Sequence, residues 1–240
     1  MSSSAPADAH LICGKRGFGK TTLAEHLSGS MKRPVVYCGN PEWEGFGATS
    51  GTYRDFRQCI ERALKQRERP PESLYVGPRR DVEKAIEYIT GDPGGENGEG
   101  VERGGIGCTL LIDEIYRFIP RRGKSNPHLI DALKRGRHLP PGQGGISVVG
   151  TAHKPQDVDP EMIEQAALSF FRLKQANAVQ RASRYFHESV QFDALDKYEF
   201  VNGSEGEWLT YGIGPCGGPE ILTLDTDSSQ ISQIDSFPRP

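Results

Sequence analysis

A glycine-rich segment at residues 14–21 ends in a lysine followed by a threonine. It reads Gly-Lys-Arg-Gly-Phe-Gly-Lys-Thr and fits the pattern G-x-x-x-x-G-K-[ST] at every fixed position. A short apolar run precedes the segment at residues 11–13, and a helical pattern follows it from about Thr21. In such a strand–loop–helix unit, backbone N–H groups and the helix N-terminus converge on phosphate oxygens. The segment therefore predicts a site for the phosphate groups of a nucleotide.

The side chains of this loop carry separate predictions. Lys20 is expected to reach the β- and γ-phosphates, and the hydroxyl of Thr21 is expected to bind Mg²⁺. Thr22 is expected to face the α-phosphate or to support the start of the helix. A glycine-rich turn with a chance lysine is the alternative, and the flanking strand and helix argue against it. The predicted nucleotide-binding residues are Gly14, Lys15, Arg16, Gly17, Phe18, Gly19, Lys20, Thr21 and Thr22.

An apolar run at residues 108–112 ends in two adjacent carboxylates, Asp113 and Glu114. Ligands of open parallel sheets gather at the carboxyl ends of the strands, so this pair is expected beside the phosphate-binding loop. Asp113 is then expected to hold Mg²⁺, directly or through water. Glu114 is placed to polarise a water molecule for in-line attack on the γ-phosphate. The alternative is that Glu114 only caps a helix or forms a structural salt bridge.

A third apolar run, at residues 145–150, also ends in polar residues. If its strand lies between the other two, its carboxyl end is adjacent to the γ-phosphate. His153 is then placed to sense that phosphate, although a lone histidine after a strand is more often structural.

The order of these motifs resembles the FtsK–HerA superfamily of DNA-pumping ATPases. Within it, the chain is similar to the genome-packaging ATPases of membrane-containing, double-jelly-roll viruses. The resemblance covers roughly residues 10–190, and His153 stands where glutamine is usual in the family. It is carried by residues 14–21, the Leu-Leu-Ile-Asp-Glu of residues 110–114, the basic segment 131–137, and the Val-Gly-Thr-Ala-His-Lys-Pro of residues 149–155.

The resemblance implies an α/β P-loop NTPase of the additional-strand, catalytic-glutamate type, with a central, mainly parallel sheet flanked by helices. It implies ATP and Mg²⁺ at the site, and a homo-oligomeric ring, usually a hexamer, that moves double-stranded DNA. Viral capsid or portal proteins are the implied partners, in the host cytoplasm and at the capsid vertex of the virion. A neighbouring subunit is expected to supply an arginine to each site, and Arg135 and Arg137 are the candidates.

The length of 240 residues suits one α/β domain. We expect a flexible N-terminal tail at residues 1–10 and an ATPase core at residues 11–190. Residues 191–240 are expected to form a C-terminal β-hairpin, with its strands between residues 200 and 211, and an acidic, flexible tail.

Charge is distributed unevenly along the chain, although the net charge is only −3. Residues 115–154 hold eight Lys/Arg and a single acid, whereas residues 187–240 hold ten Asp/Glu. A basic stripe is the expected footprint of contact with a nucleic-acid backbone, and a solvated basic face is the alternative. Arg121, Arg122 and Lys124 are the candidate DNA contacts, on a loop that would line a central pore.

Composition limits the remaining functional classes. No run of 18 apolar residues occurs, so direct insertion into a membrane is not expected. The five cysteines form no C-x-x-C pair, which argues for a reducing compartment. A phage-extrusion ATPase of the zonula-occludens-toxin type, similar around residues 136–138, is the alternative motor. A P-loop phosphotransferase and a non-catalytic nucleotide switch are the alternatives from other classes.

Overall fold

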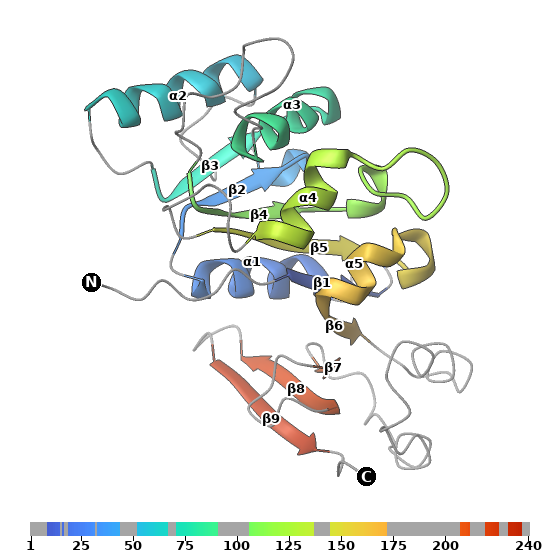
Figure 1. The fold of residues 1–240 in the computed structure, drawn as a ribbon. Helices are drawn as coiled ribbons and strands as arrows, with labels where there is room; N and C mark the ends of the chain where they lie inside the picture. Colours follow the sequence, from blue (N-terminus) through green and yellow to red (C-terminus); the bar gives the residue numbers. More distant parts are fainter. Residues whose placement is uncertain are drawn as a thin grey trace.

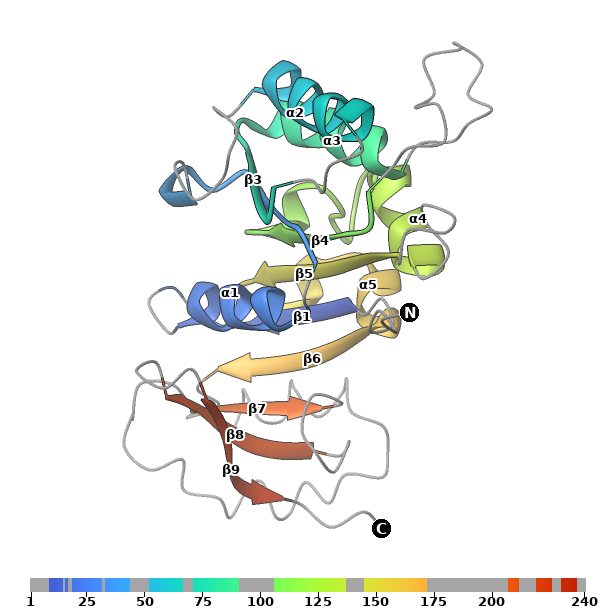
Figure 2. The same ribbon diagram turned by 90° about the vertical axis from the view of Figure 1, so that its left-hand side faces the viewer.

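The central feature of the chain is one sheet of nine strands in the order β3-β2-β4-β5-β1-β6-β7-β8-β9 (Figure 1). The computed structural model describes residues 9–14, 16, 19–31, 33–43, 52–66, 71–90, 106–136, 145–171, 207–211, 219–225 and 230–236. Figure 2 shows the strands stacked in this order, from β3 at the top to β9 at the bottom. Neighbouring strands from β3 to β6 run parallel: β1 (Ala9–Cys13), β2 (Val35–Cys38), β3 (Ser73–Val76), β4 (Cys108–Ile112), β5 (Ile146–Ala152) and β6 (Ala166–Phe171).

Strand β5 lies between β1, which leads into the glycine-rich loop, and β4, which ends in the acidic pair. Cys13 is in register with Ala152, and Ile112 is in register with Gly150. The carboxyl ends of these strands therefore meet at one edge of the sheet, as the motifs predicted. This arrangement confirms the additional-strand type of P-loop fold.

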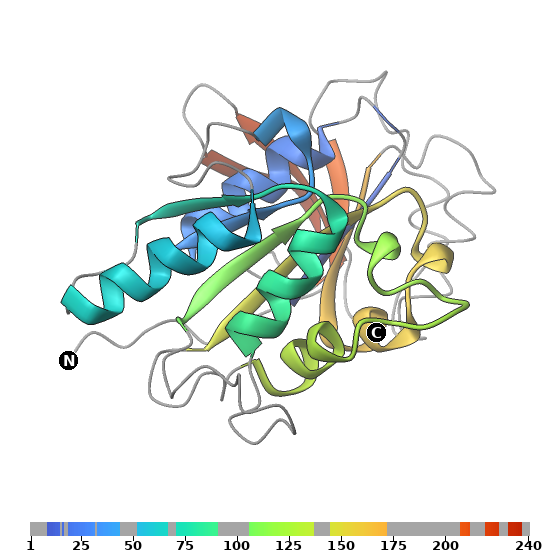
Figure 3. The same cartoon turned by 90° about the horizontal axis from the view of Figure 1, so that it is seen from above.

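Helices cover both faces of the parallel sheet (Figure 3). Helix α1 (Lys20–Ser30) covers one face, whereas α2 (Tyr53–Gln66), α3 (Arg79–Thr90), α4 (Pro127–Arg135) and α5 (Pro160–Gln165) lie on the other. Successive strand residues divide between the two cores: Leu11 packs on the side of α2–α5, and Ile12 packs on the side of α1. Both are fully buried, which explains why these strands read as continuous apolar runs.

Residue Ile115 fixes the chain just after β4 against the neighbouring strand. It begins a short 3₁₀ helix, η2 (Ile115–Arg117), and is fully buried. Its side chain occupies the space beside Gly150, where an added Cβ would lie 2.6 Å from Cδ1 of Ile115. This close approach sets the position of the acidic pair relative to β5.

The C-terminal strands correct part of the prediction. Strand β7 (Glu207–Tyr211) forms where the second strand of the hairpin was predicted, and it pairs antiparallel with both β6 and β8. Strands β8 (Pro219–Asp225) and β9 (Gln230–Ser236) form where a flexible tail was expected. Their apolar residues do not alternate strictly: Ile221 and Leu222 are adjacent in β8, Ile231 and Ile234 are three positions apart in β9, and the register shifts between Ile221 and Leu222. Residues 172–206, and the hairpin turn predicted there, lie outside the described residues.

Candidate nucleotide-binding and catalytic site

The glycine-rich loop continues β1 and opens helix α1. The N–H of Gly14 donates to the carbonyl of Ala152 at 3.1 Å, which extends the pairing of β1 with β5 into the loop. Gly19 precedes α1 with a φ of 86°, a left-handed conformation that glycine adopts without a Cβ penalty. The first turn of α1 is thereby directed at the edge of the sheet where the strands end. Lys15, Gly17 and Phe18 lie outside the described residues.

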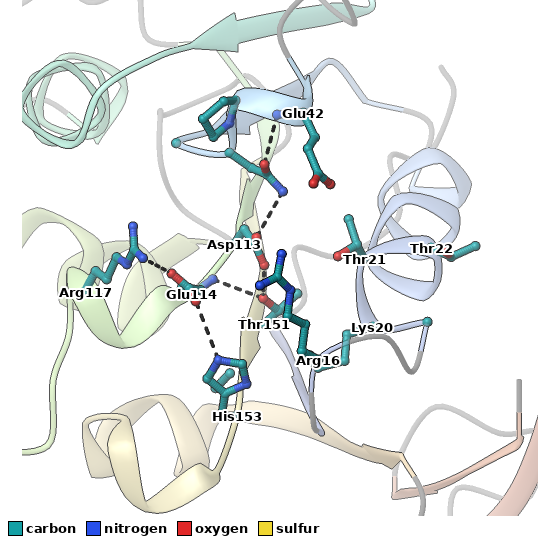
Figure 4. Close-up of a pocket in the computed structure, with 15 residues that line it drawn as sticks. Arg16, Lys20, Thr21, Thr22, Glu42, Asp113, Glu114, Arg117, Thr151 and His153 are labelled. Carbon is teal, nitrogen blue, oxygen red and sulfur yellow. Dashed lines mark hydrogen bonds and ion pairs between the residues drawn. The ribbon is translucent and has the colours of Figure 1, made fainter. Parts of the chain in front are cut away.

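A cavity of about 720 Å³ opens at this edge (Figure 4). Its volume lies within the range typical of small-ligand sites. Residues from the loop, from the end of β4 and from the end of β5 line it together, so the structure joins the three predicted segments. The predicted residues on its wall are Arg16, Gly19, Lys20, Thr21, Thr22, Asp113, Glu114 and His153.

Asp113 is held by hydrogen bonds from both neighbouring strand ends. Asn40, just after β2, donates through Nδ2 to Oδ2 of Asp113 at 3.0 Å. Thr151 of β5 donates its hydroxyl proton to Oδ1 of the same carboxylate. These bonds fix the carboxylate, and Thr21 lines the same cavity. Hard oxygen donors of this kind, one carboxylate and one hydroxyl, fit Mg²⁺, which usually takes its remaining ligands from water and phosphate.

Lys20 is the cation that faces this acidic wall. Burial lowers the pKa of Lys20 below its usual range, and the charges of Asp113, Cys13 and Glu114 act in the opposite direction. A partly buried ammonium beside carboxylates is a suitable counter-charge for phosphate oxygens, because water screens it less than an exposed one.

Glu114 adopts an unusual backbone conformation at the end of β4. Its φ of 51° makes it the one positive-φ residue other than glycine among the described residues. Its N–H donates to the hydroxyl of Thr151 at 3.0 Å, which holds this conformation in place. Such conformations persist where surrounding contacts enforce them, and they are enriched at functional sites.

The carboxylate of Glu114 faces two cationic or polar side chains. Its Oε2 forms an ion pair with Nη2 of Arg117, and its Oε1 lies 3.6 Å from Nε2 of His153. The His153 ring also lies beside the Tyr116 ring, with centroids 6.2 Å apart. His153 therefore lies beside the predicted base, on the rim of the cavity. Its role as a phosphate sensor stays a prediction.

Arg135, one of the two arginines expected to serve a neighbouring subunit, is not among the residues that line this cavity. Arg135, at the end of α4, forms two hydrogen bonds of 2.5 Å with Asp131. The next residue, Gly136, lies against the carbonyl of Ile146 at the start of β5. Ile146 lies at the opposite end of β5 from Thr151, which lines the cavity, and the strand between them spans about 16 Å. Arg135 therefore does not line its own cavity, and its role at a neighbouring subunit stays a prediction; Arg137 lies outside the described residues.

The basic loop after η2 is exposed and anchored at its base. Arg121, Arg122 and Lys124 are all exposed. The ends of this loop are tied to the segment after β5. The N–H of Arg121 donates to the carbonyl of Asp157 at 3.1 Å, and the hydroxyl of Ser125 donates to Asp159 at 2.7 Å. The three cations are thus presented on a loop with a fixed base.

Four residues with polar or charged side chains on the cavity wall were not predicted from the sequence: Asn40, Glu42, Arg117 and Thr151. Asn40 and Thr151 each follow or end an apolar strand, so the rule that strand ends meet could have identified them. Glu42 adds a third carboxylate, and its N–H donates to Oδ1 of Asn40 at 3.0 Å. Arg117 gave no sequence signal beyond its charge.

Comparisons with solved structures match the fold described above. The genome packaging NTPase B204 from Sulfolobus turreted icosahedral virus 2, in complex with AMPPCP, aligns with a TM-score of 0.59 and 19% identity, over 95% of this chain and 97% of that chain. This chain has a P-loop NTPase fold. B204 from Sulfolobus turreted icosahedral virus, described as a DNA-packaging ATPase, aligns with a TM-score of 0.56 and 19% identity, over 95% and 97% of the two chains. No protein-family model and no curated protein sequence matches the chain.

Within this P-loop NTPase fold, the cavity combines the groups that phosphate chemistry requires. A lysine and a helix N-terminus face it from one side, and an oriented aspartate and a glutamate face it from the other. Among the described helices, none is both long and apolar enough to cross a bilayer.

Proposed function

We propose that this chain hydrolyses ATP and uses the energy to translocate double-stranded viral DNA into a preformed capsid. The observation that carries the hydrolytic part is the meeting of Lys20, Thr21, Asp113 and Glu114 around one cavity. Each belongs to a motif that was predicted separately, and the sheet order brings them together. In this proposal the triphosphate binds between helix α1 and the ends of β4 and β5.

Each residue has one task in the proposed reaction. Lys20 binds the β- and γ-phosphate oxygens, and the N-terminus of α1 adds its partial positive charge. Glu114 accepts the proton of the attacking water as that water bonds to the γ-phosphorus. Thr21 and Asp113 would hold Mg²⁺, which when bound offsets the charge on the phosphate oxygens. Thr151 keeps Asp113 and the Glu114 backbone in fixed positions through its hydroxyl.

Three features support the motor function. The fold is similar along most of its length to structures described as a genome packaging NTPase and a DNA-packaging ATPase. The exposed cations Arg121, Arg122 and Lys124 suit non-specific contact with a phosphate backbone, as a motor requires. Arg135 lies far from its own cavity, so in a homo-oligomeric ring it is available to a neighbouring site. Capsid or portal proteins are the proposed docking partners, which would place the chain in the host cytoplasm and in the virion.

A phosphotransferase is the second candidate from another class, and the site favours it less. Such an enzyme needs groups that orient an acceptor hydroxyl. Here the base candidate Glu114 lies beside Arg117 and His153, in a setting that suits water as the acceptor.

Steady-state phosphate release distinguishes these functions. It is measured with ATP and with GTP, with and without duplex DNA, on a sample whose assembly mass is determined in parallel. The proposal predicts hydrolysis without any added small-molecule acceptor, stimulated by duplex DNA in the assembled fraction. ADP formation that requires a small-molecule acceptor, with the γ-phosphoryl group recovered on that acceptor and no free phosphate, would instead support the phosphotransferase.

A further inference from the structure

Arg117 is an arginine on the cavity wall that belongs to none of the motifs. It ends η2, three residues after Glu114, and lines the same cavity as Lys20 and Thr21. Its side chain is 56% exposed, so the guanidinium lies at the surface of the cavity and not in the core. Figure 4 shows it pointing toward Glu114.

The contact between Arg117 and Glu114 is directional. The guanidinium meets Oε2 of Glu114 through Nη2, while His153 lies near the other carboxylate oxygen. A guanidinium is planar and carries five N–H donors, so it can bind two anions at once along different edges. Arg117 can therefore donate hydrogen bonds to a second anion while it stays paired with Glu114.

Charge on the cavity wall indicates what a second anion would be. Asp113, Glu114 and Glu42 make one side acidic, and Arg16, Lys20 and Arg117 are the cations among its lining residues. Lys20 and Arg117 come from different elements, the start of α1 and the end of η2. A terminal phosphate bound by Lys20 and attacked by a water at Glu114 would lie between these two cations.

We propose that Arg117 binds the terminal phosphate of the nucleotide and orients Glu114 within the same subunit. The inference rests on the proposed function and adds a residue to it. In the reaction, the water oxygen bonds to the γ-phosphorus and the bond to the bridging β–γ oxygen breaks. The water proton passes to Glu114, and the bridging oxygen leaves with the nucleoside diphosphate. Arg117 forms no covalent bond; it donates hydrogen bonds to the phosphoryl oxygens and to Glu114.

This role differs from that of the arginine expected from a neighbour. Arg135 is engaged by Asp131 at the far end of α4, whereas Arg117 is already at the site. Removing Arg117 should therefore affect nucleotide binding in a monomer as well as in an assembly. If Arg117 only formed a surface salt bridge with Glu114, its removal would change nucleotide binding in neither the monomer nor the assembly.

Nucleotide affinity tests the phosphate contact directly. Binding of AMPPCP and of ADP is measured for the wild type, Arg117→Ala and Arg117→Lys, with Arg62→Gln, an exposed arginine on α2, as the matched control. We expect Arg117→Ala to weaken AMPPCP binding about 10-fold and to leave ADP binding within about twofold, because only AMPPCP has a γ-phosphate. Arg117→Lys should recover part of the AMPPCP affinity, since a lysine keeps the charge.

Turnover tests the orientation of Glu114. We expect kcat for ATP to fall about 100-fold in Arg117→Ala, and to stay low in Arg117→Lys because an ammonium lacks the planar fork. If Arg117→Ala matched Arg62→Gln in both the AMPPCP-to-ADP affinity ratio and kcat, the inference would be overturned. A wild type without hydrolysis under any condition would contradict the proposed function instead, and the affinity ratio would still decide the role of Arg117.

Discussion

Thr151 and Asp113, on adjacent strands, are joined by a hydrogen bond from the threonine hydroxyl to Oδ1 of the carboxylate. The same hydroxyl accepts the N–H of Glu114 at 3.0 Å. Thr151 is fully buried, so neither bond can be replaced by solvent without rearrangement. One side chain on the inserted strand β5 thus fixes both members of the acidic pair.

Replacing Thr151 with valine should impair hydrolysis more than folding. Valine keeps the shape but removes the hydroxyl, which frees the Asp113 carboxylate and the Glu114 backbone. We expect kcat/KM for Mg·ATP to fall about 10–100-fold, as for other residues that orient metal ligands. Steady-state kinetics over a range of Mg²⁺ concentrations measure the effect. Thr151→Ser retains the hydroxyl and should stay near the wild type, whereas an equal loss in both variants would assign the defect to packing.

Nucleotide binding should weaken at alkaline pH because the pKa of Lys20 is lowered by burial. The charged ammonium is the form that binds phosphate, and bound phosphate favours that form. Affinity should therefore fall as the pH rises through the lowered pKa, below the ordinary value of 10.5. Titration of a fluorescent ATP analogue between neutral and alkaline pH measures this.

Two variants control the alkaline effect. Lys20→Met should lose most nucleotide affinity at every pH, with no alkaline decline of its own. Lys20→Arg should bind less tightly than the wild type but keep a constant affinity over the same range, because arginine stays protonated. An identical alkaline decline in Lys20→Arg would show that another group titrates.

Gly150→Ala should destabilise the fold through a single contact. The new Cβ would lie 2.6 Å from Cδ1 of Ile115, and overpacking of this kind costs about 1–3 kcal/mol. Chemical denaturation of Gly150→Ala, Ile115→Ala and the double variant measures the coupling. Because Ile115→Ala removes the clashing atoms, the double variant should be less destabilised than the sum of the single variants. Simple additivity would mean that the clash is relieved elsewhere.

The basic loop should be needed for the stimulation of ATP hydrolysis by DNA and not for hydrolysis without DNA. Replacing Arg121, Arg122 and Lys124 with alanine is expected to reduce the DNA-stimulated part of ATP hydrolysis at least about 10-fold and to weaken its salt dependence. Hydrolysis without DNA should change by less than about twofold, because none of the three lines the cavity. Phosphate release with and without duplex DNA, at two salt concentrations, measures both.

A variant with the same loss of charge elsewhere provides the control for this loop. Arg54, Arg62 and Lys65 are exposed on α2, and replacing them with glutamine removes three charges far from the loop. DNA stimulation should persist in that variant. Equal losses of basal and stimulated hydrolysis in the loop variant would argue against a DNA contact there.

Residues with fixed backbone requirements were predictable from the sequence. The loop at residues 14–21 has glycines where the chain must turn, and the run before Asp113 is apolar because β4 is buried on both faces. These two features predicted the meeting of Lys20 with Asp113, whereas the place of β5 between β1 and β4 came from the resemblance.

Residues whose role depends on a neighbouring element of the folded chain were not predictable from the sequence. Asn40 acts on Asp113 only because β2 is the neighbour of β4, and Arg117 meets Glu114 only because a 3₁₀ turn follows the strand. Strands β8 and β9 were missed for a different reason. Their surroundings are rich in glycine, serine and aspartate, and their few apolar residues do not alternate. No local pattern reveals their pairing with β7 and with each other.

Phosphate release by Glu114→Gln at saturating Mg·ATP is the most direct test of the central claim, that Glu114 activates the water at a site built by the glycine-rich loop. Glutamine keeps the size of the side chain but cannot accept the proton, so we predict retained ATP binding and a rate about 10²–10⁴-fold below the wild type. A Glu114→Gln protein that binds ATP and hydrolyses it at the wild-type rate would contradict the account.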